Sequence, residues 1–79
     1  MRTKYQLLLK STLRGNNQLQ EISRELEATG WKPHNLAGGD LLFVSNRPEH
    51  KFKDMSSVTR YLKGYLSDKQ LARLEIVQA

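Results

Sequence analysis

The residues best suited to bind another molecule fall in one short basic loop and on the helix expected after it. Arginine and lysine side chains neutralise phosphates, and a phenylalanine ring can stack on an unpaired nucleic-acid base. The sequence therefore predicts a contact with nucleic acid or another partner by Arg47, His50, Lys51, Phe52, Lys53, Arg60 and Lys63. The alternative is a solvated loop in which Phe52 packs into the core.

Residues that could carry catalysis are sparse. The chain has two histidines, His34 and His50, and no cysteine, and no serine lies in a nucleophile-elbow pattern. A metal site needs three or four ligands, whereas His34 and Asp40 together supply two. Gly38 and Gly39 are not followed by the lysine and hydroxyl residue of a phosphate-binding loop. We predict no catalytic residue, no metal and no cofactor, and we favour a protein without enzymatic activity.

Composition limits the class of protein further. The chain has 79 residues, with 13 lysines and arginines against 8 acidic residues, and a formal net charge of +5. This length favours a single domain over residues 1–79. No stretch approaches the ~20 apolar residues that span a bilayer, and no secretion signal is recognisable, so we expect a cytoplasmic protein without membrane contact. The basic excess favours an anionic partner, although segment 21–30 holds three glutamates and one arginine.

Hydrophobic periodicity and turn residues predict the secondary structure. Alternating apolar residues indicate strands, and apolar residues at helical spacing behind a capping residue indicate helices. Pro33 should lie at a sheet edge or at the start of its strand, because proline lacks an N–H. The expected elements are a strand over 3–13, a helix capped by Asn17 and ended by Gly30, strands over 31–36 and 41–45, a helix starting at Asp54 or Ser56, an extra turn from Ser67, and a strand over 74–77.

This order of strand, helix, strand, strand, helix and strand predicts an α+β fold. It matches the ferredoxin-like βαββαβ plan, in which a four-stranded antiparallel sheet carries both helices on one face. The other face is then uncovered. We expect it to be apolar and to bind a second copy or another partner through Leu7, Leu9, Leu41 and Phe43. Stacking of bases there is not expected, because these positions are mostly aliphatic.

The layout resembles the small ferredoxin-like proteins of the CRISPR-associated endonuclease and virulence-associated protein D group. The resemblance covers nearly the whole chain and lies in Tyr5–Lys10, the helix ending at Gly30-Trp31, Leu41–Ser45 and Leu74–Val77. It implies a dimer, and in several members a metal-dependent nuclease with an aspartate at the end of the first strand. This chain has Lys10-Ser11-Thr12 there, so the resemblance implies dimerisation and nucleic-acid contact without the catalytic aspartate.

Three hypotheses about function follow. The first is a small basic, non-catalytic regulatory protein that binds RNA or DNA as a homodimer. The second is a regulator or inhibitor that binds a protein, such as an antitoxin or a phage- or plasmid-encoded factor acting on a host protein. The third is a metal-dependent ribonuclease with Asp40 and His34 near the metal.

Overall fold

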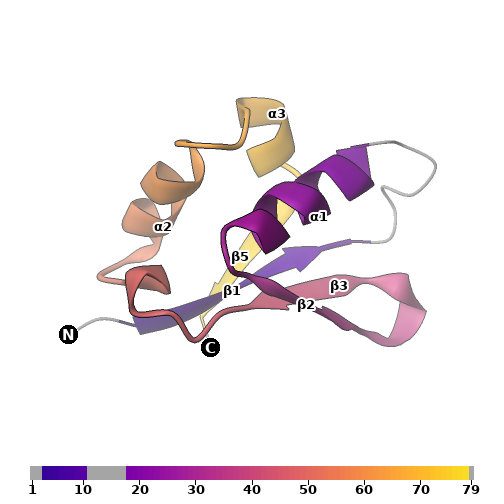
Figure 1. Cartoon of the computed structure of the whole chain (residues 1–79), viewed down its shortest axis with the longest axis horizontal. Helices are drawn as coiled ribbons and strands as arrows, with labels where there is room; N and C mark the ends of the chain where they lie inside the picture. Colours follow the sequence, from indigo (N-terminus) through magenta and orange to yellow (C-terminus); the bar gives the residue numbers. More distant parts are fainter. Residues whose placement is uncertain (1–2, 11–17, 79) are drawn as a thin grey trace.

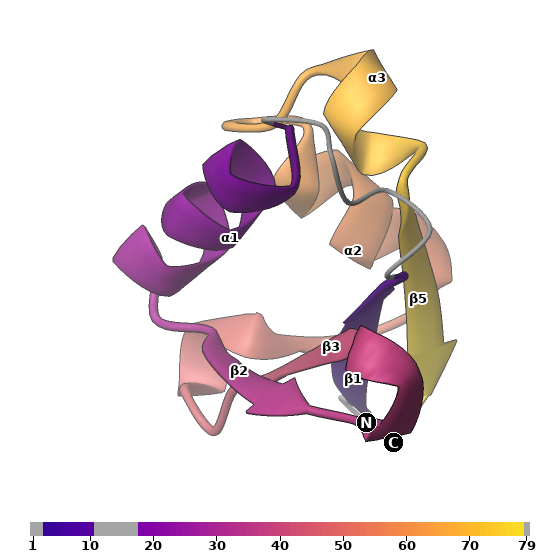
Figure 2. The ribbon, with the colours of Figure 1, turned by 90° about the vertical axis from the view of Figure 1, so that its right-hand side faces the viewer.

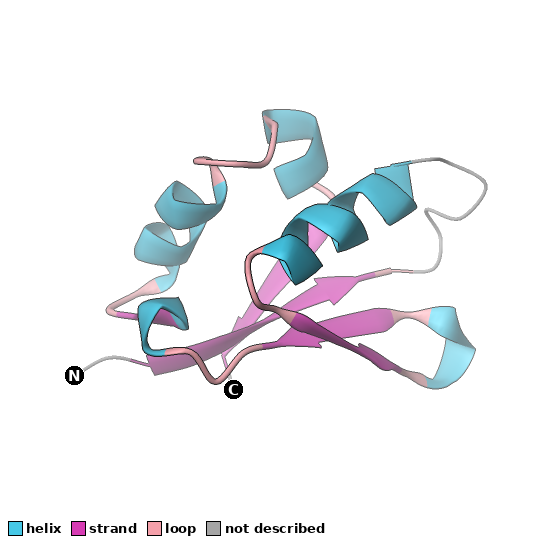
Figure 3. Cartoon of the chain, viewed as in Figure 1, coloured by secondary structure: helices cyan, strands magenta, loops and turns pink. Residues whose placement is uncertain are grey.

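The fold consists of one antiparallel sheet with helices over one of its faces (Figures 1 and 3). The structure is a computed structural model that describes residues 3–10 and 18–78. The predicted break and helix cap within 11–17 lie outside these residues. The described strands are β1 (Thr3–Leu9), β2 (Lys32–Asn35), β3 (Leu41–Val44), β4 (Lys51–Phe52) and β5 (Leu74–Gln78), and the helices are α1 (Gln18–Ala28), α2 (Met55–Leu62) and α3 (Asp68–Leu71). Two 3₁₀ turns, Ala37–Gly39 and Pro48–His50, join the strands.

β1 is the central strand of the sheet. It pairs antiparallel with β3, where Leu7 lies opposite Phe43, and with β5, where Leu7 lies opposite Ile76. β2 pairs with β3 as a hairpin, and Pro33 lies on this outer strand as predicted. Figure 2 shows the helices above the sheet, with β2 and β5 at its two sides.

The strand count corrects one sequence prediction. The α+β class and the antiparallel sheet are confirmed, and the fold is compatible with a ferredoxin-like plan, but the sheet has five strands and its topology differs from the expected one. The difference arises in the predicted loop 46–53. There Lys51 and Phe52 return to the sheet and lie opposite Lys4 and Thr3, which adds β4.

Local capping explains where the helices begin and end. The Asp54 carboxylate accepts a hydrogen bond from the Ser57 backbone N–H at 2.9 Å, which confirms Asp54 as the N-cap of α2. Ser67 and Gln70 satisfy each other's backbone N–H groups in a capping box, and this starts α3. Gly30 ends the turn after α1 at a φ of +103°, a backbone conformation that favours glycine.

The hydrophobic core lies between the sheet and the helices. Its buried apolar residues are Tyr5, Leu7, Leu9, Ile22, Leu26, Trp31, Phe43, Phe52, Val58, Leu62 and Leu66. Leu7, Leu9 and Phe43 are 0% exposed, and Leu41 is half-buried against this cluster, so their predicted place on the uncovered face is wrong. Both faces of β1 and β3 contain apolar residues, and the helices cover the face that carries these four.

Candidate nucleic-acid interface and adjoining cleft

The face of the sheet away from the helices carries a mixture of apolar and basic side chains. Side chains alternate along a strand, so the neighbours of the buried residues Tyr5, Leu7 and Phe43 point to this side. We call it the uncovered face. Its apolar members are Leu8, Leu42, Val44 and Val77, and its lysines are Lys4, Lys32 and Lys51. His34, Gln6 and Glu75 complete the described part of the face.

Two lysines face each other directly on this surface. Lys4 and Lys51 are register partners across β1 and β4. Phe52, next to Lys51, is buried on the helix side, so both lysines point to the uncovered face. Like charges directly opposite each other destabilise a sheet. The one ion pair between described residues joins Arg47 and Glu49 at 3.8 Å, so neither lysine has an acidic partner among them. An anion bound here would relieve the repulsion.

The predicted contact residues separate into two groups. His50 is 1% exposed and Phe52 is 7% exposed, so neither side chain offers a surface to a partner; for Phe52 this is the alternative predicted from the sequence, in which its ring packs into the core. Phe52 instead packs against the rings of Tyr5 and Tyr61. The exposed members are Arg47, Lys51, Lys53, Arg60 and Lys63.

The exposed members do not form one patch. Arg60 lies on α2 and Lys63 caps its C-terminal end, above the sheet, whereas Lys51 points to the opposite side (Figure 1). Lys4 and Lys32 share the uncovered face with Lys51, whereas Arg60 and Lys63 do not. Sequence reasoning did not group Lys4 and Lys32 with Lys51, because only the strand register shows which lysines share a face, although the alternation of Lys4 with Tyr5 is a usable signal for Lys4.

A buried polar network holds the loop after β3. A hydrogen bond of 2.5 Å joins Ser45 Oγ to His50 Nδ1, and one of 3.0 Å joins His50 Nε2 to Tyr61 Oη. The Arg47 backbone N–H donates to Ser45 Oγ at 3.2 Å. The Trp31 ring stacks on the imidazole with their centroids 4.4 Å apart. The serine and histidine thus fix the backbone at Arg47.

Burial disfavours the protonated form of this histidine. Desolvation lowers the pKa of His50, and the nearby Arg47 lowers it further, while Glu49 raises it. Burial also raises the pKa of Tyr61. Ser45 is 4% exposed, and its hydroxyl is engaged by both His50 Nδ1 and the Arg47 backbone N–H, so the serine–histidine pair braces the loop.

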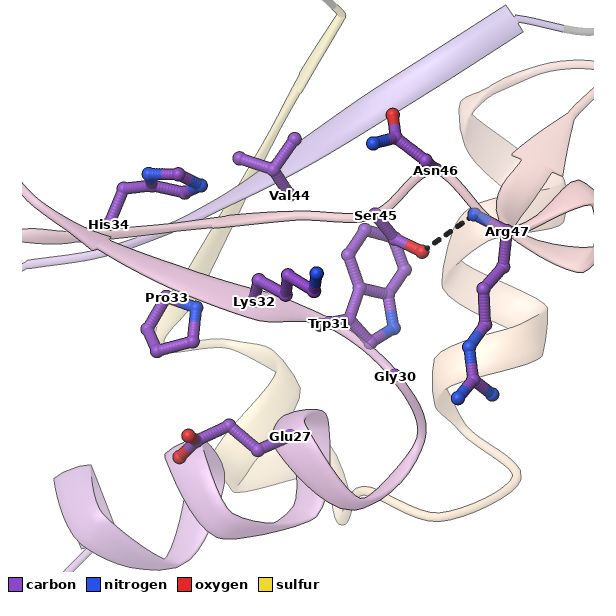
Figure 4. Close-up of a pocket in the computed structure, with 10 residues that line it drawn as sticks. All are labelled: Glu27, Gly30, Trp31, Lys32, Pro33, His34, Val44, Ser45, Asn46 and Arg47. Carbon is purple, nitrogen blue, oxygen red and sulfur yellow. Dashed lines mark hydrogen bonds between the residues drawn. The ribbon is translucent and has the colours of Figure 1, made fainter.

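A cleft of about 720 Å³ opens beside β2. Residues from the end of α1, from β2, and from the end of β3 with the loop after it line this cleft (Figure 4). Lys32, His34 and Arg47 give it basic groups, and Glu27 gives it a single acidic group. Lys32 also belongs to the uncovered face, so the cleft continues that face around the edge of the sheet.

Arg47 lies across the turn that ends α1. A Cβ atom built on Gly30 would come within 2.3 Å of Arg47 Nε, so the guanidinium rests directly on this glycine. Arg47 Nη1 donates to the Thr29 carbonyl oxygen at 3.5 Å, at a helix C-terminus where a positive charge is favourable. The cation is therefore held at both its backbone and its side chain.

The described residues contain no group of three histidine, aspartate or glutamate side chains placed to hold a metal. His34 is exposed on β2, and Asp40 is half-buried after the turn that follows this strand. The pair named in the ribonuclease hypothesis therefore has no third ligand within residues 3–10 and 18–78.

Comparison with protein-family models, with curated proteins and with solved structures finds no match for this chain. None of the described helices is both long enough and apolar enough to cross a bilayer.

Proposed function

We propose that this protein is a small non-catalytic regulator that binds RNA or DNA as a homodimer, with phosphates contacting the uncovered face. The observation that carries this proposal is the opposed pair Lys4 and Lys51. Two cations without an acidic partner among the described residues form an electrostatic site that a polyanion fills. Lys32 on β2 adds a third cation on the same face.

The distribution of aromatic residues indicates how the nucleic acid is bound. Tyr5, Trp31, Phe43 and Phe52 are buried. No described phenylalanine, tyrosine or tryptophan side chain points to the uncovered face, so the imidazole of His34 is the one ring there among the described residues on which a base could stack. Binding is therefore through the phosphate backbone, with a strong salt dependence and little preference for base sequence.

The arrangement of the strands supports a variant of the ferredoxin-like plan. β2, β3, β1 and β5 follow one another across the sheet, and the crossings through α1 and through α2 with α3 lie on one side. β4 and α3 are additions to that plan.

The free edge of β5 supports the homodimer. No described strand pairs with that edge, and β5 contains neither proline nor lysine, residues that block strand addition. The opposite edge of the sheet, β2, contains Pro33. A two-fold axis at Ile76 would place Glu75 opposite the partner's Val77, which keeps the two carboxylates apart. Pairing then stops at two copies.

Fluorescence anisotropy with labelled duplex DNA, duplex RNA and single strands between 50 and 200 mM salt tests the nucleic-acid part. Each phosphate neutralised on DNA contributes about −0.9 to the slope of log K against log salt. We expect the Lys4→Ala, Lys51→Ala double variant to lose about 2 units of this slope per protomer. A matched control is Arg24→Ala, Lys69→Ala, which removes the same charge from α1 and α3. Equal losses in both variants, or no binding at 50 mM salt, would refute the proposal.

Light scattering with a charge swap tests the dimer separately. Val77 is 36% exposed, so its replacement leaves the core intact. Val77→Glu would bring a carboxylate opposite the partner's Glu75 and shift the protein toward monomer, whereas Val77→Lys would retain the dimer. A monomeric wild-type protein at 100 μM, or identical behaviour of the two variants, would contradict pairing through β5.

The uncovered face also favours a second candidate function. Leu8, Leu42 and Val44 are half-buried and Val77 is exposed, which gives this face an apolar centre among its lysines. Such a centre suits a protein partner as well as a second copy. Failure to bind any nucleic acid, together with stoichiometric capture of one host protein that Leu42→Lys abolishes, would favour the regulator or inhibitor hypothesis.

A further inference from the structure

The cleft beside β2 is too large for a simple anion. Its volume of about 720 Å³ lies within the 300–1,000 Å³ that is typical of small-molecule sites. Trp31, Pro33 and Val44 are among the residues that line it. A ligand that fills it needs an apolar body as well as a charged group.

The charged part of the cleft is preorganised for a phosphate. The Arg47 backbone N–H donates to Ser45 Oγ, and the side-chain Nη1 donates to the Thr29 carbonyl oxygen and lies 3.8 Å from Glu49 Oε2, which an incoming phosphate would have to displace. A guanidinium fixed in this way retains further N–H donors for an oxyanion, and its planar shape suits phosphate. Lys32 contributes a second cation from the neighbouring strand.

Groups that accept hydrogen bonds also line the cleft. The Glu27 carboxylate comes from α1, and Asn46, which both donates and accepts, comes from the loop after β3. In Figure 4 the carboxylate of Glu27 and the guanidinium of Arg47 are drawn on opposite sides, with Trp31 and Lys32 between them. The cleft thus offers cations for an anionic group and a carboxylate for hydroxyl or amine donors.

We infer that this cleft binds a nucleoside phosphate, with the phosphate at Arg47 and Lys32 and the sugar hydroxyls or base amine toward Glu27. The same chemistry has two sources: a free nucleotide, or the terminal nucleotide of a strand that lies on the uncovered face. The first source is independent of the proposed function, and the second rests on it.

The single tryptophan of the chain provides the readout. Trp31 lines the cleft and stacks on His50, so an occupant should change its emission. The intact protein is titrated with each of the four nucleoside 5′-monophosphates, and with ribose 5-phosphate, inorganic phosphate and adenosine. We expect saturable binding of at least one nucleotide, at least tenfold tighter than ribose 5-phosphate, phosphate or adenosine.

Matched variants assign the signal to the cleft. Lys32→Ala and Arg47→Ala should each weaken nucleotide binding at least tenfold. The affinity of Arg47→Lys should fall between those of Arg47→Ala and wild type, because lysine keeps the charge but lacks the planar guanidinium that donates two parallel hydrogen bonds. Lys63→Ala removes an exposed cation above the sheet and should have no effect. Because these side chains are exposed, circular dichroism should show that all four variants keep the wild-type fold.

The outcomes separate this inference from the proposed function. No saturable response to any nucleotide at 5 mM, equal binding of inorganic phosphate, or unchanged binding in both alanine variants would overturn the inference. A 5′-phosphorylated oligonucleotide that displaces the nucleotide, where its 5′-hydroxyl counterpart does not, identifies a strand end as the source. Nucleotide binding in a protein that binds no nucleic acid supports the free nucleotide and refutes the proposed function alone.

Discussion

Replacement of Lys51 by glutamate should strengthen the fold and weaken nucleic-acid binding at the same time. Lys51 lies opposite Lys4 on the uncovered face. In Lys51→Glu a repulsive cross-strand pair becomes an attractive one, while the charge of the proposed interface falls by two units. Most substitutions that damage a binding site have no reason to stabilise the protein, so opposite signs of the two effects are diagnostic.

The size of the stabilisation follows from the register. Side chains directly opposite each other have Cβ atoms about 4.5–5.5 Å apart. Two unit charges about 6 Å apart in water interact by about 0.7 kcal/mol, so reversing the sign changes the energy by about 1.4 kcal/mol. Screening over a Debye length of about 8 Å at physiological salt leaves about half of this. We expect the free energy of unfolding to rise by about 0.7 kcal/mol, or Tm by about 3–5 °C.

Urea denaturation measures the stability, and anisotropy with duplex DNA measures binding on the same preparations. In a Lys4→Ala background the stabilisation by Lys51→Glu should vanish, because the partner charge is absent. High salt should reduce it as well. A Lys51→Glu protein that is less stable than wild type would refute the opposed pair, and unchanged DNA affinity would refute the interface.

Three further outcomes follow from the site and the caps. Burial lowers the pKa of folded His50 below the unfolded value of about 6.5, so the free energy of unfolding should fall as the pH drops through 6.5 toward the folded pKa. Urea midpoints at pH 8 and pH 5.5 measure this fall. The difference between the two midpoints should be smaller in His50→Gln. Gly30→Ala should cost more stability than Gly38→Ala: both glycines have positive φ, but only the first Cβ meets Arg47, and equal midpoints would contradict this packing. Asp54→Ala should lower the urea midpoint and leave nucleic-acid binding unchanged, since it removes the α2 cap.

The sequence was sufficient to predict most elements but not which face they bury. Features that depend on local chemistry could be predicted from the sequence. These are the caps at Asp54 and Ser67, the glycine that ends α1 and the edge position of Pro33. The sequence did not show which face of β1 is buried. Leu8 breaks its alternation, so both faces contain leucine, and only packing against α1 and α2 selects the buried set.

The candidate site was less predictable, because it depends on contacts between distant segments. The residues next to His50 and Phe52 in the sequence do not indicate that His50 stacks on Trp31, or that Phe52 pairs with Thr3 in β4. A basic loop with a ring looks the same whether the ring is exposed or buried. The pairing of Lys4 with Lys51 joins residues far apart in the chain and appears only once the register is fixed.

The central position of β1 has a consequence for synthesis on the ribosome. The first described strand pairs with the last, since Tyr5 lies opposite Gln78. At 5–20 residues per second, roughly 4–15 s pass between the emergence of these two segments. Throughout that interval one edge of β1 has unpaired backbone groups beside a run of leucines. The hydrogen bonds along this edge of β1 therefore form only once residues 74–78 have been made, so the sheet cannot be completed earlier in synthesis.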